Sequence, residues 1–511
     1  MPTPREKLAA SLEQLSQVQG DRRVLRSDEI SRTHRERLMR SGFLRQATKG
    51  WLFVANPADR LDDATGWYGC FWEFCVQRCQ HRFGDAWHLS AEGSILRHAG
   101  LGLIPPQVIV CSPLASNHSV DLPHETSLFD LKTNAHAGHE DVLVDPDGVR
   151  LLCVETALVS ASERFFTSHR VAVMTVMAQM NDHSKLLGRL LDGAHSTIAG
   201  RLAGALRAVG RADAADDVLH AMKRAGFDVR EAPPWQQYAS LSSLRSRTHP
   251  AAARLRVMWA DLRSVVVSAM PTARGARPDT DAYLAAVDEN YQQDAYHSLS
   301  IEGYRVSPEL IERVRSGTWN PESDADDASA RDAMAALGYW RAFQQVRLAV
   351  GEVVNGADPS ALLRERHRHW HRELFAPSVD MGLVKASDLG GYRQHAVFLS
   401  GSRYAPMNWS AVPEAMAEFF DLLENEDELS VRAVLGHFCF VYIHPFPDGN
   451  GRMARFIMNL MLAEGGYPWT VVRVVDRQRY MAALESASVH YAIEPFAKFA
   501  AERVAASGSA A

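Results

Sequence analysis

The sequence predicts a mainly α-helical protein whose N-terminal half also contains β-strands. Three segments have apolar residues at helical spacing over a long stretch: 251–270, 282–301 and 452–463. Short apolar segments typical of strands lie in the first half, at 108–111 and 142–144. The chain has 511 residues, which is too long for a single hydrophobic core, so we expect several domains.

Composition and charge are those of an ordinary soluble protein. The formal net charge of -6 neither favours nor excludes nucleic acid as a partner. No apolar run is long enough to span a membrane, and the N-terminus lacks a signal-peptide pattern, so we expect a cytoplasmic protein with no membrane partner. Cys75 and Cys79 lie four apart on a predicted helix, but no nearby Cys or His pair completes a zinc site. We interpret the six cysteines as buried free thiols in a reducing compartment.

The run from His444 to Arg455 contains side chains that can bind phosphate and move a proton. Glycines flank Asn450, and such a turn can present several backbone N–H groups to an anion. The residues after the turn are apolar at helical spacing, so a helix begins there and its N-terminus favours negative charge. Arg452 and Arg455 can both reach phosphate oxygens from the first helical turn. Asp448 offers a hard oxygen ligand for Mg²⁺, and His444 suits proton transfer near neutral pH.

The same run resembles the motif of the Fic (filamentation induced by cAMP) family, His-x-Phe-x-Asp/Glu-Gly-Asn-Gly-Arg-x-x-Arg, at every fixed position. Several fixed residues at fixed spacing make this motif far more specific than a lone Gly-x-Gly. The resemblance continues from residue 279 to about residue 503, a little under half of the chain. It implies an α-helical Fic core that transfers AMP from ATP to a protein hydroxyl, with ATP and Mg²⁺ as cofactors. The alternative is a Gly-Asn-Gly turn followed by an ordinary surface helix.

The resemblance also implies a role for each residue of the motif. His444 would deprotonate the target Ser, Thr or Tyr, whose oxygen would attack the α-phosphorus of ATP while pyrophosphate leaves. Asp448 would bind Mg²⁺, Arg455 would bind the terminal phosphate, and Phe446 would point inward and anchor the loop. Four consecutive residues would surround the phosphates: Gly449, Asn450, Gly451 and Arg452.

Upstream of the motif, residues 389–393 and 397–401 resemble the family's flap. Their alternation and glycines predict a short β-hairpin, whose edge would align the target segment by strand addition. Pro406 matches the end of the flap, where relatives often have two prolines and this chain has Ala405 before Pro406. The flap residues expected to border the nucleotide are Val397, Phe398, Leu399 and Ser400.

Downstream of the motif, Tyr480 resembles a residue that borders the adenine. Relatives often carry an aromatic pair and a later asparagine there, whereas this chain has Met481 and Ser488. The alternative for Tyr480 is simple packing on a helix face.

Ser298, Glu302 and Gly303 fit the family's inhibitory pattern, Ser/Thr-x-x-x-Glu-Gly/Asn, at the end of a predicted helix. Because this helix precedes the core, the resemblance implies the class that is inhibited in cis. Glu302 would pair with Arg455 in a bidentate manner, and an Arg455 so engaged could not hold the γ-phosphate. Ser298 would bond to the catalytic loop near Asn450. The alternative is a surface glutamate followed by a C-cap glycine.

The first sixty residues predict a winged helix-turn-helix. We expect helices over 7–18, from Ser27 onward and over 32–41, followed by strands at 43–46 and 51–54 that form the wing. The third helix would enter a major groove while the wing touches phosphates. The candidate DNA contacts are Arg32, Arg35, Arg37, Arg45 and Lys49. The region resembles the N-terminal part of AbiEi-type antitoxins, which are transcriptional autoregulators, although such folds also serve as protein-contact modules.

The expected domain order has four parts. They are a winged helix-turn-helix (1–60), an AbiEi-like α+β middle domain (61–235), a helical linker (236–280) and the Fic domain with its inhibitory helix (281–505). In the middle domain, strand candidates precede helices, an order that resembles the body of an AbiEi-type antitoxin.

The leading functional hypothesis is a self-restrained protein adenylyltransferase of a bacterial type, joined to a DNA-binding or partner-recognising N-terminal half. Its partners would be ATP, a protein hydroxyl (including its own) and duplex DNA, and the resemblance also allows a homodimer. A hypothesis of another class is a transcriptional regulator whose Fic part senses nucleotide without transferring it. A third is removal of AMP from a modified protein, or transfer of another nucleotide, with Glu302 positioning a water molecule.

Overall fold

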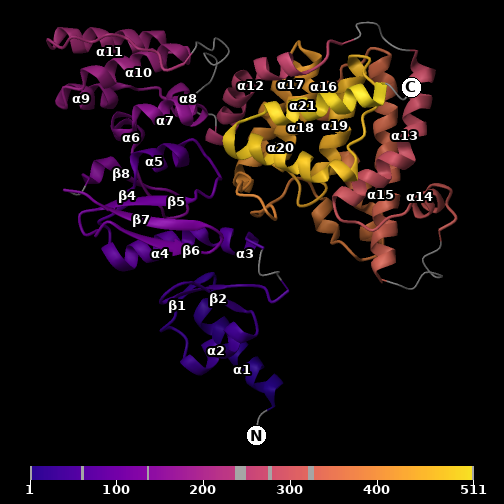
Figure 1. Ribbon diagram of the computed structural model, residues 1–511, viewed down its shortest axis with the longest axis horizontal. Coiled ribbons are helices and arrows are strands. Elements are labelled where there is room, and N and C mark those ends of the chain that lie inside the picture. Colours follow the sequence, from indigo (N-terminus) through magenta and orange to yellow (C-terminus); the bar gives the residue numbers. More distant parts are fainter. Residues whose placement is uncertain are drawn as a thin grey trace. The chain divides into compact units, whose positions relative to one another are not determined.

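The computed structural model describes residues 3–58, 63–134, 137–235, 249–273, 279–319 and 327–508. The chain forms two compact units. One contains Met1–Pro250 together with Phe398–Ala405, and the other contains Ala251–Val397 together with Pro406–Ala511. Along the described chain, every named strand lies in the first 152 residues and the orange and yellow second half is helical (Figure 1). The mainly helical fold class is therefore confirmed, while the four-part domain division stays a prediction. Part of its linker, 236–248 and 274–278, lies outside the described residues.

The first unit begins with a small module of helices and an antiparallel sheet of strand order β1-β3-β2. Its elements are α1 (Pro4–Gln19), β1 (Val24–Arg26), α2 (Arg32–Arg40), β2 (Leu44–Thr48) and β3 (Trp51–Val54). The predicted wing is present as the β2–β3 hairpin. The helix expected to begin at Ser27 is wrong, because 27–30 forms a turn. The N–H of Ser27 donates to the carbonyl of Gly50 (2.9 Å), and the Glu29 carboxylate accepts the N–H of Arg26 (3.2 Å), so both bonds stabilise the turn.

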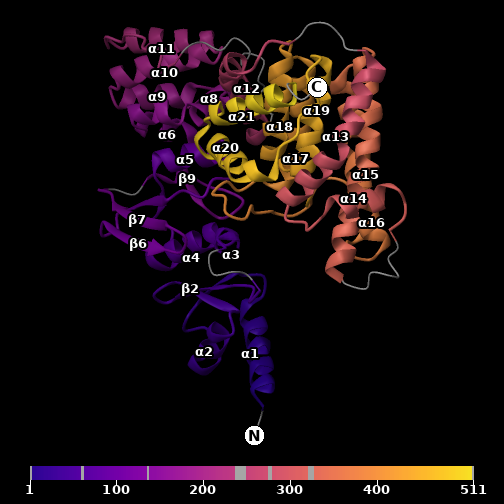
Figure 2. The ribbon, with the colours of Figure 1, turned by 45° about the vertical axis from the view of Figure 1, so that its right-hand side comes forward.

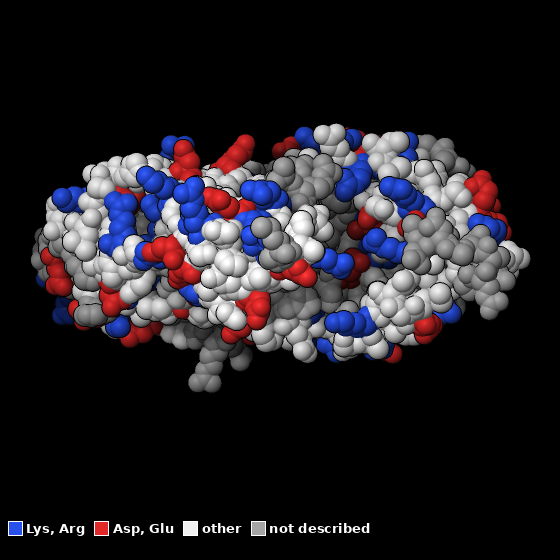
Figure 3. Space-filling model, turned by 90° about the horizontal axis from the view of Figure 1, so that it is seen from below, with Lys and Arg blue, Asp and Glu red and all other residues white. Residues whose placement is uncertain are grey.

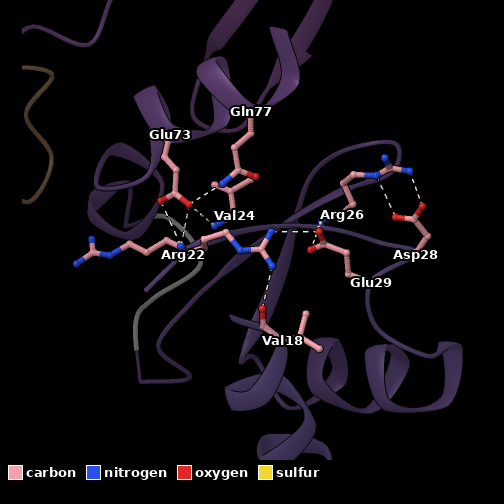
Figure 4. Close-up of polar contacts among 9 residues, drawn as sticks. Val18, Arg22, Val24, Arg26, Asp28, Glu29, Glu73 and Gln77 are labelled. Carbon is pink, nitrogen blue, oxygen red and sulfur yellow. Dashed lines mark hydrogen bonds and ion pairs between the residues drawn. The ribbon is translucent and has the colours of Figure 1, made fainter. Parts of the chain in front are cut away.

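Glu73 joins this module to the rest of the first unit (Figure 4). Its carboxylate, on α4 (Phe71–Phe83), accepts the backbone N–H groups of Arg23 (3.0 Å) and Val24 (3.1 Å), and also Gln77 Nε2 (2.9 Å). Phe53 of β3 lies in one hydrophobic core with α4. The module is thus built into the first unit and is not a loosely tethered domain.

The middle of the first unit is an α+β structure. A four-stranded sheet has the order β4-β5-β7-β6, in which only β5 and β7 run parallel. Its strands are β4 (His88–Leu89), β5 (Gln107–Ser112), β6 (His118–Leu122) and β7 (Thr126–Lys132). Figures 1 and 2 show α4 on one face of this sheet and α5 (Ala91–His98) on the other. A short helix, α3 (Thr65–Tyr68), precedes α4.

The first unit continues with a two-stranded sheet and a group of helices. The sheet pairs β8 (Val142–Val144) with β9 (Arg150–Leu152), after the short helix η1 (His139–Asp141). The strands predicted at 108–111 and 142–144 are confirmed as β5 and β8. The helices are α6 (Val154–Ser160), α7 (Glu163–Ser168), α8 (Arg170–Gln179), α9 (Ser184–Asp192), α10 (Ser196–Ala208) and α11 (Ala212–Arg224).

The second unit is helical, and α18 and α19 lie at its centre. Both are largely buried, and α15 and α16 also pack against α19 (Figure 2). The α-helices are α12 (Pro250–Ala269), α13 (Thr280–Ile301), α14 (Pro308–Arg315), α15 (Asp327–Val354), α16 (Pro359–Asp380), α17 (Val412–Glu424), α18 (Leu429–Ile443), α19 (Asn450–Glu464), α20 (Arg477–His490) and α21 (Glu494–Gly508). Short 3₁₀ helices are η3 (Ala386–Leu389), η4 (Trp409–Ala411) and η5 (Val474–Asp476). In the ranges that the structure describes, no helix combines the length and apolar character needed to cross a membrane.

The flap contains no β-hairpin, so that prediction is wrong. Residues 390–405 are irregular, and their one described bridge joins Tyr404 to Leu103. Arg393 explains part of the difference, because its backbone N–H lies in the first predicted strand and donates to the carbonyl of Pro445 (2.8 Å). An N–H that donates to a residue outside the flap is not free for a cross-strand partner.

Candidate active site

His444 lies where α18 ends and the catalytic loop begins. Its backbone has φ 53°, and its N–H donates to the carbonyl of Phe440 (3.0 Å), which closes the helix. A left-handed backbone is costly for a residue with a side chain, so the surroundings must hold it. Buried Arg393 does so, because its Nε donates to the carbonyl of His444 (2.8 Å) and its N–H donates to the carbonyl of Pro445 (2.8 Å).

The imidazole of His444 is neutral at physiological pH. Burial, and to a smaller extent the positive charge of Arg393, lower its pKa to about 4. A neutral imidazole has a free lone pair, so it can take a proton from a hydroxyl.

Phe446 and Asn450 close the loop on itself. The Oδ1 of Asn450 accepts the N–H of Phe446 (3.0 Å), and its Nδ2 donates to the carbonyl of Phe446 (2.8 Å). The Phe446 ring is buried and stacks on His371 with 3.7 Å between ring centroids. Phe446 thus points inward, and the Asn450 side chain is fully used within the loop, so only the Asn450 backbone is left to meet a phosphate.

The loop leads directly into the N-terminus of α19. Gly449 is the N-cap, with φ 83°, and a Cβ there would lie 2.7 Å from the Phe375 ring, so only glycine fits. The first N–H groups of a helix have no carbonyl partner within it. The N–H groups of Gly451 and its neighbours therefore form a site that favours an anion.

Arg452 is a buried cation at this helix terminus. It is 1% exposed, and along the described chain none of its side-chain nitrogens has a hydrogen-bond partner. Its guanidinium lies over the rings of Phe375 (4.9 Å) and Tyr304 (5.3 Å), and Nη2 is 3.7 Å from Asp448 Oδ2. A buried charge without hydrogen bonds costs free energy. An anion that accepted from Arg452 would recover part of that cost.

Arg455, one turn further along α19, is already engaged. Its Nε donates to Ser298 Oγ (2.8 Å), and its Nη2 donates to the carbonyl of Ser298 (3.1 Å) and to Glu302 Oε1 (2.9 Å). Burial lowers the pKa of Arg455, but the Glu302 carboxylate raises it and the net shift is upward.

Two details of the Arg455 contacts differ from the predictions. The pair has one hydrogen bond and is not bidentate, and Ser298 bonds to Arg455 and not to the loop near Asn450.

Glu302 lies against the first turn of α19. It is the C-cap of α13, its side chain is 23% exposed, and Gly303 follows with φ 88°. A Cβ on Gly451 would collide with Glu302 Oε1, so glycine permits this approach. The carboxylate therefore occupies space beside the N–H groups that an anion would use.

Sequence reasoning missed Asp294, which completes the polar face of α13. Asp294 is buried, accepts from the hydroxyl of Tyr339 (2.7 Å) and has a pKa raised by burial to about 6. The signal was available: Asp294, Ser298 and Glu302 recur every four residues, a spacing that puts them on one side of a helix. His371, whose Nε2 bonds to the carbonyl of Asp448 (3.0 Å), was missed too, and nothing in its sequence context marks it.

The remaining nucleotide-binding candidates have other surroundings. Tyr480 is buried, its hydroxyl bonds to His437 Nε2 (2.8 Å) and its ring packs on Phe496. These contacts agree with the alternative in which Tyr480 packs on a helix face. Val397 belongs to the second unit. The other flap candidates, Phe398, Leu399 and Ser400, belong to the first.

Asp448 is the candidate metal ligand. Its side chain is 62% exposed, and its Oδ1 accepts the N–H of Gly449 (2.6 Å). The described part of the chain contains no group of three or more His, Cys, Asp or Glu side chains placed for a metal. Mg²⁺ is commonly held by one or two carboxylates plus substrate phosphates, so a single exposed carboxylate beside a phosphate site fits it.

The predicted DNA contacts are not equally available. Arg35 donates to the carbonyl of Ser27, and Arg37 donates to the carbonyl of Lys7 (2.8 Å). Arg32 is exposed and pairs with Glu36 (2.8 Å). On the face shown in Figure 3, Lys and Arg lie among Asp and Glu and do not form one continuous basic surface. Arg45 lies on β2 and exposed Lys49 lies in the wing turn.

The comparisons with known proteins agree on the family that this chain resembles. Residues 361–462 match the model of the Fic/DOC family. The chain is 29% identical over 220 residues to Protein adenylyltransferase Fic of Nematostella vectensis, covering 42% of this chain and 47% of that protein. It is 31% identical over 224 residues to Protein adenylyltransferase fic-1 of Caenorhabditis elegans, covering 43% and 41%. The chain thus spans less than half the length of these curated relatives. Both are animal proteins, so a bacterial type stays a prediction.

Two solved structures are also similar. One is C. elegans Fic-1, with 19% identity, 70% of this chain and 94% of that chain covered, and a TM-score of 0.36. The other is a Fic domain containing signaling protein from Bacteroides thetaiotaomicron, with 17% identity, 49% and 94% covered, and a TM-score of 0.37. The family-model match and the curated relatives agree that residues 361–462 of this chain are similar to the Fic/DOC family.

Proposed function

We propose that this chain transfers AMP from ATP to a Ser, Thr or Tyr hydroxyl of a protein, including its own, and that Glu302 restrains the reaction. The observation that carries the proposal is the buried Arg452, whose donors lack partners, at a helix N-terminus that follows the neutral His444. The curated relatives are named protein adenylyltransferases, which supports AMP as the transferred group.

The proposed reaction divides the work among few groups. His444 takes the proton of the target hydroxyl, and the oxygen forms a bond to the α-phosphorus of ATP. The bond from that phosphorus to the bridging oxygen breaks, and pyrophosphate leaves with the electron pair. Arg452 and the N–H groups of α19 stabilise the phosphate charge. Mg²⁺, which Asp448 would hold, neutralises part of that charge when bound.

The proposed restraint acts through Arg455. A guanidinium that donates to Ser298 and Glu302 has fewer donors for the terminal phosphate. The Glu302 carboxylate also places a negative charge beside the helix N-terminus, where it opposes an incoming phosphate. Loss of Glu302 therefore removes both a competitor and a like charge.

The test is incorporation of AMP from α-labelled ATP into protein by wild type, Glu302→Ala, His444→Ala and the double variant. We expect strong labelling of Glu302→Ala and none of the double variant. Labelling that survives His444→Ala would show that the proposed base is wrong. Repeating the assay with each nucleotide triphosphate, and with pre-modified protein, separates AMP transfer from transfer of another nucleotide and from AMP removal.

A second candidate function is binding of duplex DNA by the N-terminal module. The observation that favours it is the β2–β3 wing following α2, with exposed Arg32 and Lys49 on these elements. We expect full-length protein to bind duplex DNA with an affinity that falls steeply with salt. Lys49→Gln should weaken binding, whereas Lys132→Gln, on an exposed lysine of β7, should not. Salt-insensitive or absent binding would favour a protein partner, and with it the protein-contact role of such modules.

Two further parts of the proposal concern the cellular compartment and the oligomeric state. All six cysteines are buried free thiols, which persist in the reducing cytoplasm, so we place the activity there. A homodimer is the expected oligomer, and sedimentation of the full chain would test it.

A further inference from the structure

One side of α16 lies against the catalytic loop, within the second unit. His367, His371 and Phe375 recur every four residues along this helix, so their side chains share one side of it. All three are buried. We call these three residues the α16 face. Each of them contacts a different part of the candidate active site.

The outer two members of the α16 face contact the two ends of the site. His367 Nε2 bonds to the hydroxyl of Tyr392 (2.8 Å), at the start of the flap. The Phe375 ring lies 4.9 Å from the Arg452 guanidinium, and it is also the ring that a Cβ on Gly449 would meet. One helix therefore contacts both the start of the flap and the N-terminus of α19.

His371, the middle member, makes two different contacts with the loop. Its ring stacks on the Phe446 ring, with 3.7 Å between centroids and 7° between the planes. Its Nε2 lies 3.0 Å from the carbonyl oxygen of Asp448. Because a carbonyl oxygen only accepts, Nε2 carries the proton and donates. The first contact is packing and the second is directional, so substitution can separate them.

The donated hydrogen bond fixes the backbone that carries the Asp448 carboxylate. The loop turns sharply here, because the next residue, Gly449, has φ 83°. Asp448 Oδ1 accepts the N–H of Gly449 (2.6 Å), which leaves Oδ2 at 3.7 Å from Arg452 Nη2. The Asp448 side chain is 62% exposed, so few packing contacts hold it. Its orientation therefore depends on the bonds that hold its own backbone and that of Gly449.

We propose that His371 is a positioning residue, which orients the Asp448 carboxylate toward the divalent cation that accompanies ATP. It acts through its hydrogen bond to the loop backbone and not through its packing on Phe446. Groups that orient a metal-binding side chain commonly contribute roughly ten- to a hundredfold to metal affinity or activity. Metal-assisted binding of the nucleotide should therefore depend on His371, whereas binding without metal should not. This inference rests on the proposed function, in which Asp448 holds the cation.

Two substitutions separate the hydrogen bond from the packing, in the full chain with Glu302→Ala. His371→Phe keeps an aromatic ring against Phe446 and removes the donor, whereas His371→Gln keeps an N–H donor and removes the ring. His371→Leu also removes the donor and serves if His371→Phe fails to unfold cooperatively in urea. The matched control is His369→Phe, on a half-buried histidine of the same helix.

The probe is an ATP analogue with a methylene group between the α and β phosphorus atoms, which cannot transfer AMP. Its Kd is measured by calorimetry with Mn²⁺ and again with EDTA, so the readout does not depend on turnover. The same titrations in an Asp448→Ala background show whether His371 acts through Asp448. Initial rates of AMP transfer against Mg²⁺ concentration are measured in parallel.

We expect His371→Phe to weaken binding roughly tenfold with Mn²⁺ and to leave binding in EDTA unchanged. The other expected results are that His371→Gln and His369→Phe match the parent, and that His371→Phe has no further effect beside Asp448→Ala. A larger loss for His371→Gln than for His371→Phe would assign a packing role to His371 and overturn the inference. An equal loss in EDTA, or parent binding that Mn²⁺ does not strengthen, would overturn it too.

The proposed function can fail separately in the same experiment. If the parent transfers no AMP but its Mn²⁺-assisted binding still requires the donor of His371, the proposed reaction is wrong and the positioning role stands. If the parent transfers AMP and His371→Phe has the same Mg²⁺ requirement as the parent, the reaction stands and the positioning role is wrong.

Discussion

The two arginines of the first turns of α19 have the same chemistry and opposite surroundings. Arg452 has no hydrogen-bond partner for its side-chain nitrogens among the residues described; it lies over aromatic rings, and the Asp448 carboxylate is 3.7 Å from its Nη2. Arg455 donates to Ser298 twice and to Glu302 once. The two arginines lie three positions apart, and only Arg455 has hydrogen-bond partners supplied by the chain.

This difference indicates that one set of residues carries out the proposed reaction and another set restrains it. Arg452, the loop and His444 carry the proposed phosphate binding and proton transfer. Arg455 connects that site to α13, the helix that supplies Ser298 and Glu302. A change on α13 should therefore alter the restraint and leave the catalytic groups in place, whereas a change at Arg452 should weaken phosphate binding itself.

The largest expected effect comes from releasing Arg455. Glu302→Ala should raise AMP transfer roughly ten- to a hundredfold, because a charge-assisted bond is worth roughly 1.5–3 kcal/mol. The matched control is Glu289→Ala, on an exposed glutamate of the same helix. Initial rates of labelled AMP incorporation measure both. Equal rates for the two variants would show that Glu302 does not restrain AMP transfer.

The next effect concerns pH. Burial holds the pKa of His444 at about 4, below the usual value for histidine, so the ring stays neutral well into acid. In the Glu302→Ala variant, the rate should hold as pH falls to about 5.5 and should drop only as pH falls through about 4. A histidine of ordinary pKa would already have lost roughly tenfold at pH 5.5. A drop near pH 6.5 would show that His444 is not the buried base described.

Replacing each arginine by methionine should have different effects on the free energy of unfolding. Arg452→Met removes a buried charge that lacks hydrogen bonds, so the free energy of unfolding should rise or hold. Arg455→Met leaves Glu302 without its partner and should lower that energy by about 1–3 kcal/mol. Urea unfolding without nucleotide measures both. A loss of similar size in both variants would mean that the two environments do not differ.

The smallest effect is expected at Ser298. Ser298→Ala removes the hydroxyl that accepts from Arg455 Nε, while the backbone carbonyl and Glu302 still hold Nη2. AMP transfer should rise only severalfold, since one such bond is worth about 1 kcal/mol. A gain as large as that of Glu302→Ala would assign the restraint to Ser298 instead.

The catalytic loop could be predicted because its functional residues lie close together in the sequence. Gly449, Asn450 and Arg452 lie within four residues of one another, so their spacing alone indicates an anion site at the start of a helix. The mainly helical class and the wing followed from periodicity in the same way. Asp294 was within reach of this reasoning, since it shares a four-residue spacing with Ser298.

The flap and the turn after Ser27 were not predictable, because distant residues decide them. The backbone N–H of Arg393 donates to Pro445, outside the flap, and Ile104 pairs with Arg403 from almost three hundred residues away. Ser27 likewise donates its N–H to Gly50 in the turn of the wing, a contact between residues far apart in the sequence. Sequence periodicity reports local preference, and these contacts override it.

The central claim is that Arg455 is shared between Glu302 and the terminal phosphate of ATP. A double-variant cycle in AMP transfer tests it most directly, comparing wild type, Glu302→Ala, Arg455→Met and the double variant at one ATP concentration. We expect Glu302→Ala to raise the rate roughly ten- to a hundredfold when Arg455 is present and to give no gain when it is methionine. An equal gain in both backgrounds would show that Glu302 does not act through Arg455.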